Sequence, residues 1–168
     1  SGSPPNATAG SIATHPRIAL GERLLVVSVH CDDAVLSLGA TMSAHVRAGG
    51  RVTVATVLAG DPSSTRAAGD WDRATGFCLE GEATAARRSE DEAACAVLGV
   101  EAVHLDGSDD QYADRSTDWS LAAITELAGT HDEVPVPGHP LRHPDHRAVA
   151  TKVFQELAGR QMRLYFEQ

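Results

Sequence analysis

Short apolar runs of strand length alternate with stretches of helical pattern along most of this chain. Residues 24–29 (Leu-Leu-Val-Val-Ser-Val) form a continuous apolar run, which is typical of a strand covered on both faces in a parallel sheet. The expected strands are residues 24–29, 51–58, 100–105, 133–136 and 162–166, and the expected helices are residues 35–48, 83–98, 118–128 and 144–158. This alternation predicts an α/β fold, a Rossmann-like three-layer α/β/α sandwich with a mainly parallel sheet.

The chain has 168 residues, enough for one compact domain and too few for two ordinary ones. Residues 1–18 are rich in small residues and proline, and we expect a flexible leader there. No domain boundary is visible in the sequence after this leader, so residues 19–168 are predicted to form a single domain. Residues 60–81 are a long mixed segment with four glycines, a length at which loops often form binding walls.

Charge and cysteine content exclude several classes of protein. Lysine and arginine number 14 against 23 acidic residues, a net charge of −9 that disfavours nucleic acid and anionic membranes as partners. No apolar run reaches the roughly 18 residues of a membrane span, and no secretory signal pattern is present. The three cysteines are far apart and form no CxxC motif, which fits a reducing compartment. We therefore expect a cytoplasmic protein.

Two clusters of polar residues follow expected strands, and the carboxyl ends of parallel strands are where such folds bind ligands. His30 and Asp33 come after the first strand, and His146 comes after the fourth. These two imidazoles and one carboxylate suit zinc, with ferrous iron as the alternative. Asp32 would stand beside the metal without binding it, placed to take a proton from water. Either cluster alone is more typical of histidines that cap helices or satisfy buried groups, but both at one edge favour a site.

Pro144 and Cys31 refine this interpretation. Proline at the first helical position predicts that His143 is the N-cap residue of a helix. Cys31 raises the alternative of a nucleophilic cysteine with His30 or His143 as its base. Adjacent strand residues point to opposite faces, which disfavours a pair with His30, so a buried packing cysteine is the preferred interpretation. No glycine-rich phosphate loop follows the first strand, which disfavours a nicotinamide-cofactor enzyme.

Three separated motifs resemble those of the LmbE/PIG-L family of zinc-dependent N-deacetylases. Residues 29–34 (Val-His-Cys-Asp-Asp-Ala) resemble its opening Pro-His-Pro-Asp-Asp-Glu motif, and residues 87–90 (Arg-Arg-Ser-Glu) its Arg-x-x-Glu helix. Residues 143–146 (His-Pro-Asp-His) match its closing motif directly. The three motifs occur in the family's order and cover nearly the whole chain from about residue 23 onward.

The resemblance implies a role for each matching residue. His30, Asp33 and His146 match the metal ligands, and Asp32 matches the general base. The remaining matches are His143 as the acid that protonates the leaving amine, Arg87 as the substrate-contacting arginine, and Asp114 as an acid that holds sugar hydroxyls. An ion pair of Arg87 with Glu90 or Asp91 on its own helix is an equal alternative for the arginine.

The function implied is removal of an acetyl group from an N-acetylated amino sugar or a glycoconjugate that carries one, in antibiotic or thiol-cofactor biosynthesis. The implied partner is this small-molecule substrate, and relatives are often homo-oligomers. The chain departs from the family motifs at four positions: Val29, Cys31, Ala34 and Leu141. These departures leave two alternatives open, a conjugate amidase that acts on a larger amide and a sugar-binding paralogue with impaired turnover.

Overall fold

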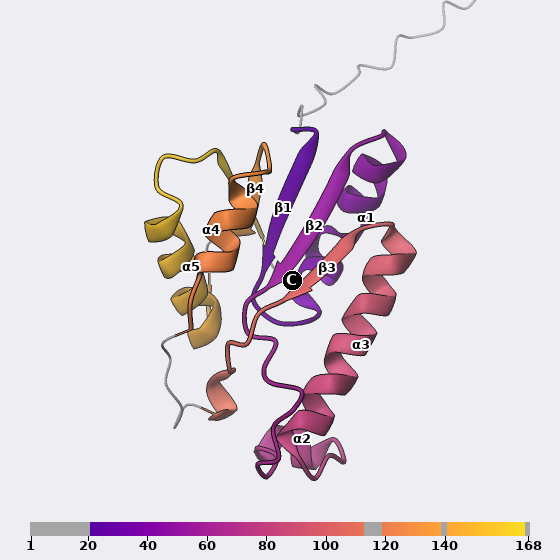
Figure 1. The fold of residues 1–168 in the computed structure, drawn as a ribbon, viewed down its shortest axis with the longest axis vertical. Helices are drawn as coiled ribbons and strands as arrows, with labels where there is room; N and C mark the ends of the chain where they lie inside the picture. The colour runs from indigo at the N-terminus through magenta and orange to yellow at the C-terminus, as the bar shows by residue number, and fades with distance from the viewer. Residues whose placement is uncertain (1–20, 113–118, 139–140, 167–168) are drawn as a thin grey trace, which may run out of the picture.

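Five parallel strands form the centre of the fold in the computed structural model, which describes residues 21–112, 119–138 and 141–166. β1 (Arg23–Ser28) pairs with β2 (Arg51–Thr56), β2 pairs with β3 (Glu101–His104), and β4 (Val134–Pro137) pairs with β5 (Met162–Tyr165). β4 also lies beside β1, where the Leu25 N–H donates to the Glu133 carbonyl at 3.0 Å. The spatial order is therefore β3-β2-β1-β4-β5 (Figure 1), and the predicted α/β fold with parallel strands is confirmed.

Helices connect these strands largely as the sequence predicts. The α-helices are α1 (Asp33–Arg47), α2 (Asp70–Ala74), α3 (Glu80–Leu98), α4 (Ala122–Ala128) and α5 (Pro144–Glu156), and a 3₁₀ turn, η1, spans Asp110–Tyr112. α2 falls inside the segment expected to be a loop, and α3 begins at Glu80 rather than at residue 83. The start expected at residue 118 and the leader expected over residues 1–18 lie outside the described residues.

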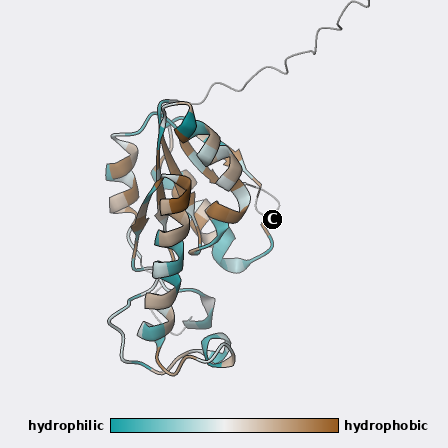
Figure 2. Ribbon diagram, turned by 90° about the vertical axis from the view of Figure 1, so that its right-hand side faces the viewer, coloured by the Kyte–Doolittle hydropathy of each residue, from teal (hydrophilic) through white to brown (hydrophobic). Residues whose placement is uncertain are grey.

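The side chains of β1 alternate between two hydrophobic layers. Leu24 and Val26 pack in a cluster with Met42 of α1 and Cys95 of α3. On the other face, Leu25 and Val27 pack with helices α4 and α5. Both faces of the strand are thus buried, as its continuous apolar run predicts. Figures 1 and 2 show the strands as an apolar centre between helices on either side.

Val153 tests the packing between α5 and the sheet. Its side chain is fully buried, and replacement by alanine is expected to lower the free energy of unfolding by about 2 kcal/mol, because two methyl groups leave the core. Val97 on α3 is 88% exposed and provides the matched control. Val97→Ala is expected to stay within about 0.5 kcal/mol of the wild type. Urea denaturation of both variants measures the difference, and equal values would contradict this assignment of the core.

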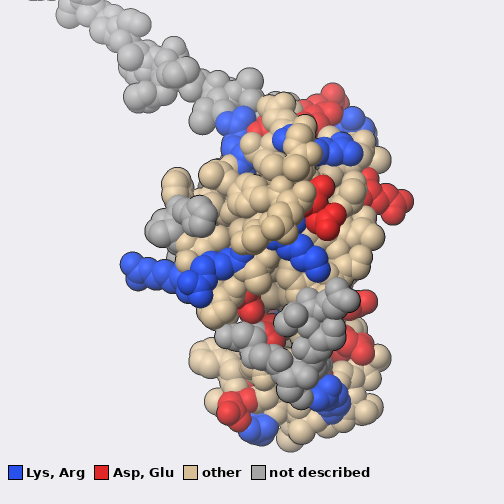
Figure 3. Space-filling view, turned by 90° about the vertical axis from the view of Figure 1, so that its left-hand side faces the viewer, with Lys and Arg blue, Asp and Glu red and all other residues tan. Residues whose placement is uncertain are grey.

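The surface carries charges of both signs. On the face shown in Figure 3, basic and acidic side chains are dispersed over a mostly uncharged surface. Within the described residues, no helix is long and apolar enough to cross a membrane.

Candidate metal centre and active-site cavity

The strand order places the predicted site at a change of direction in the sheet. After β1 the chain builds the sheet toward β2 and β3, and it later returns to place β4 on the other side of β1. In open parallel sheets, the carboxyl ends of the two strands that flank such a switch form a crevice for ligands. His30 follows β1, and the loop after β4 leads to His143 at the start of α5. Residues more than 110 positions apart in sequence therefore meet there.

His30, Asp33 and His146 lie at the corners of a nearly equilateral triangle. The Nδ1 atom of His30 is 3.3 Å from Oδ2 of Asp33 and 3.2 Å from Nε2 of His146. The His146 Nε2 and Asp33 Oδ2 atoms are 3.4 Å apart. Metal–ligand bonds of about 2.0–2.1 Å at tetrahedral angles would separate ligand atoms by about 3.3–3.4 Å. The donor set and its spacing therefore fit a zinc ion.

Asp145 supports this triangle from behind, a role that the sequence analysis missed. Its Oδ2 atom is 3.0 Å from Nε2 of His30, the ring nitrogen that does not face the triangle. Burial lowers the pKa of His30, but hydrogen bonds to Asp145 and Asp33 outweigh it and raise that pKa to about 10. Burial likewise opposes ionisation of Asp33, yet its hydrogen bonds with His30 hold its pKa below the usual value. The two carboxylates thus create a potential that favours positive charge at the centre.

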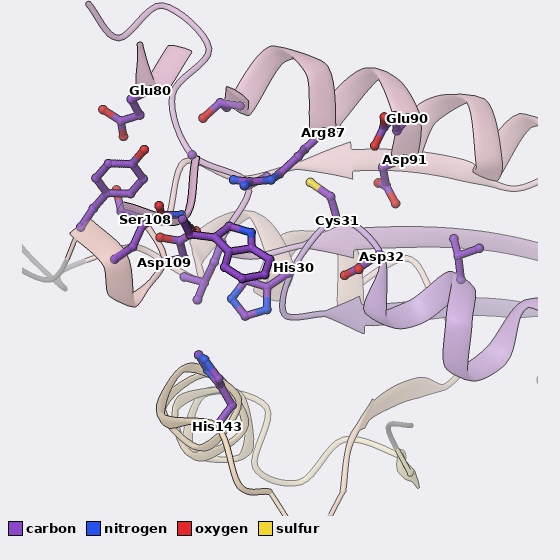
Figure 4. Close-up of a pocket in the computed structure, with 18 of the residues that line it drawn as sticks. His30, Cys31, Asp32, Glu80, Arg87, Glu90, Asp91, Ser108, Asp109 and His143 are labelled. Atoms are coloured by element: carbon purple, nitrogen blue, oxygen red, sulfur yellow. Dashed lines mark hydrogen bonds between the residues drawn. The ribbon is translucent and has the colours of Figure 1, made fainter. Parts of the chain in front are cut away.

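A cavity of about 610 Å³ opens next to the triangle and is lined by His30, Asp32 and His143. Asp32 is exposed at the N-cap of α1, where its side chain makes no capping hydrogen bond. His143 is the N-cap of α5, as predicted, and its Nδ1 accepts a hydrogen bond from the Asp145 N–H at 3.3 Å. Figure 4 shows His30 and Asp32 at the strand end, with His143 approaching from the opposite side. The structure therefore brings five predicted residues to one place: His30, Asp32, Asp33, His143 and His146.

Arg87 lies in the cavity wall and is held by a partner on another helix. Its guanidinium forms an ion pair with Asp72 of α2, and Asp72 also accepts a hydrogen bond from the Tyr112 hydroxyl at 2.6 Å. Asp72 is almost fully buried, so the pair orients the arginine firmly. The alternative pair with Glu90 or Asp91 is not the one observed. α2 was not expected because its five residues depend on these tertiary contacts.

The Arg88 side chain binds a different set of groups. Its guanidinium donates to the carbonyl oxygens of Ala59 and Leu105 at 3.1 and 3.2 Å, and it pairs with Asp106. These bonds tie the ends of β2 and β3 together. Of the two neighbouring arginines, Arg87 is the one that lines the cavity.

Asp109 is a second cavity residue that the sequence analysis missed. Among the described residues, its Oδ1 atom is one of two buried side-chain oxygen atoms without a hydrogen-bond partner. Burial raises its pKa, although the Gln111 amide and the charges of His30 and Arg87 oppose this shift. Asp114, the acid predicted for this loop, lies outside the described residues. The short β3 and the turn η1 bring Asp109 into place, and no motif spacing in the sequence marks it.

Cys31 is half-buried in the cavity wall rather than buried in packing. Burial and the charge of Asp91 raise the pKa of its thiol to about 12. The thiol is therefore protonated at neutral pH, which disfavours the alternative of a nucleophilic cysteine.

The sequence matches one protein family and several solved deacetylase structures. The family described as GlcNAc-PI de-N-acetylase (PIG-L) matches residues 25–156. The A40926 pseudoaglycone deacetylase Dbv21 is 32% identical, with a TM-score of 0.69 over 87% of this chain and 64% of that chain. A deacetylase of the teicoplanin biosynthesis pathway is 29% identical, with a TM-score of 0.64 over 86% of this chain and 67% of that one.

A more distant structure shows the fold alone. N,N'-diacetylchitobiose deacetylase from Pyrococcus horikoshii is 20% identical, with a TM-score of 0.63 over 86% of this chain and 60% of that one. The search of curated proteins found no match. The present chain spans 64% of the length of Dbv21. Because the family match extends over most of its residues, the chain belongs to the PIG-L family.

Proposed function

We propose that this protein is a zinc-dependent hydrolase that removes the acetyl group from an N-acetylated amino sugar or a glycoconjugate bearing one. The observation that carries the proposal is the triangle of His30, Asp33 and His146 beside a cavity lined by Asp32 and His143. The names of the related structures support it, since Dbv21 is a pseudoaglycone deacetylase and another relative acts in teicoplanin biosynthesis.

His30, Asp33 and His146 would hold the zinc ion, which when bound would supply Lewis-acid polarisation and a lowered pKa for water. Asp32 then acts as the general base, because its carboxylate faces the cavity and does not belong to the triangle. His143 acts as the general acid toward the leaving amine. Nε2 is the ring nitrogen that would deliver the proton, because Nδ1 faces the Asp145 backbone N–H at 3.3 Å.

The far wall of the cavity would bind the sugar. Arg87 offers a guanidinium fixed by Asp72, and Asp109 offers a buried carboxylate oxygen with no partner among the described residues. Burying such an oxygen is costly, which favours a substrate hydroxyl as its partner. Trp71 also lines the cavity and is 67% exposed, so its ring can stack on a sugar face.

A screen for acetate release tests this proposal. The acceptors are N-acetylglucosaminyl inositol, N-acetylglucosaminyl phosphatidylinositol and a glycopeptide pseudoaglycone with N-acetylglucosamine, assayed with one equivalent of zinc. Release from the glycopeptide or the inositol would assign antibiotic or thiol-cofactor biosynthesis, respectively. Longer acyl groups on the same sugars distinguish a conjugate amidase. Zinc-dependent sugar binding with no release from any acceptor would favour a paralogue without turnover and contradict the proposal.

The cytoplasmic location and the homo-oligomeric state stay predictions from the sequence.

Asp145→Asn is expected to weaken zinc binding about 10- to 100-fold, the usual effect of removing a carboxylate that holds a metal-binding histidine. The asparagine keeps the size of the side chain but loses the charge 3.0 Å from His30 Nε2. Competition with a chelator measures the affinity. Asp132→Asn is the matched control, since Asp132 also forms an ion pair, with Arg23 at the start of β1. An unchanged affinity in Asp145→Asn would remove this residue from the metal centre.

A further inference from the structure

A second group of metal-binding side chains lies outside the triangle. Cys31 follows β1, Asp91 is in the middle of α3, and His104 is the last residue of β3. One ligand atom from each, a sulfur, a carboxylate oxygen and a ring nitrogen, all lie within 4.8 Å of one another. Three segments far apart in the sequence thus deliver three different ligand types to one point.

These side chains are partly or fully buried and lie close enough to bind one cation. Asp91 is 3% exposed, and its Oδ2 atom lies 2.8 Å from Nε2 of His104. Figure 4 shows the Cys31 side chain directed toward α3, where Asp91 lies, while His30 points the other way. Arg87 and Arg88, whose charges act on the thiol, form their ion pairs with other acids: Arg87 with Asp72 and Arg88 with Asp106.

We propose that Cys31, Asp91 and His104 form a second site for a divalent cation of the zinc type. Thiolate, imidazole and carboxylate together favour zinc and cobalt over magnesium and calcium, which take oxygen ligands. Bond lengths of about 2.0–2.3 Å require the three ligand atoms to draw closer and His104 to exchange its hydrogen bond with Asp91 for the cation. The thiol releases its proton to solvent as the sulfur binds.

The position of this second cation site affects substrate binding in the cavity. Cys31 and Asp91 both line the cavity that also contains Asp32. A cation bound there occupies part of the cavity wall, so it opposes substrate binding. This consequence rests on the proposed function, whereas the site itself does not.

Cobalt titration tests the Cys31 site without any assay of activity. Cobalt bound to a thiolate has a charge-transfer band in the near ultraviolet. Cobalt bound by His30, Asp33 and His146 has no such band, because none of these ligands is a thiolate. The wild-type protein is expected to bind two equivalents of Co²⁺ and to develop the band. Cys31→Ser is expected to lose the band and one equivalent, and His104→Gln to lose the second equivalent. Cys78→Ser is the matched control, since Cys78 is an exposed thiol outside the cluster, and it should keep both. His146→Ala should lose the first equivalent and keep the band.

Absence of the band in the wild type, or its persistence in Cys31→Ser, would overturn the proposal. Circular dichroism verifies that each variant is folded. A separate arm measures acetate release at one equivalent and at excess Zn²⁺, each variant being compared with its own rate at one equivalent. Excess zinc should slow the wild type and Cys78→Ser, and the slowing should disappear in Cys31→Ser. A protein that shows the band but releases no acetate would contradict the proposed function and leave the second site established.

Discussion

Replacement of Asp32 by asparagine is expected to lower the rate of acetate release by about 10²- to 10⁴-fold, the usual contribution of a general base. The carboxylate is exposed to the cavity and lies outside the ligand triangle, so the content of bound zinc should not change. The fold should not change either, because Asp32 is the N-cap of α1 without a capping hydrogen bond, and asparagine is itself a favoured N-cap residue. The prediction thus separates loss of the base from loss of the metal.

Zinc content by elemental analysis and initial rates of acetate release on the same preparation measure the two effects. Asp70→Asn is the matched control: its carboxylate is 95% exposed, lies on α2 and is paired with Arg73. This control should keep full activity and full zinc content. An Asp32→Asn variant with a normal rate would exclude Asp32 as the base, and one that lost its zinc would place it among the ligands.

The strands and the ligand triangle are predictable from the sequence because their signals are local. The apolar run of β1 reports burial on both faces, and both layers of the core contact it. Pro144 fixes the start of α5, which places His143 at the N-cap and His146 one turn further. Parallel topology then brings the two strand ends together.

The parts of the site that the sequence did not predict depend on tertiary contacts. Arg87 pairs with Asp72, which is 15 residues away on a five-residue helix, rather than with an acid on its own helix. Such a short helix is unstable by itself, so its residues have no strong local signal. Asp109 has none either, because its position follows from β3 and the turn after it.

The start of α3 shows the same limit. The Glu82 side chain accepts a hydrogen bond from the Leu79 N–H at 3.1 Å, and Glu80 accepts one from the Ser64 hydroxyl at 2.5 Å. These bonds extend the helix back to Glu80, whose carboxyl side chain is buried. The contact with Ser64 crosses the segment expected to be a loop and could not be read from helical periodicity.

The ligand triangle makes the second prediction of a large effect, the loss of the catalytic metal. His146→Ala removes one corner, leaving two ligand atoms 3.3 Å apart and an open third position. Removing a supporting residue costs about 10- to 100-fold in metal affinity, so loss of a ligand should exceed 100-fold and bring acetate release to background. His30→Ala should have the same effect and should also remove the contact of His30 Nε2 with Asp145 Oδ2.

His45→Ala is the control, since the His45 ring contacts the Glu22 carbonyl and lies in the last turn of α1, away from the triangle. It should keep both zinc and activity. Titration of each apoprotein with zinc against a competing chelator gives the zinc affinities. A parallel titration with cobalt identifies cations bound at the Cys31 site by their near-ultraviolet band, and so separates them from cations bound at the triangle. If His146→Ala held catalytic zinc as tightly as the wild type, the triangle would not be the metal centre, and the mechanism through Asp32 and His143 would lose its foundation.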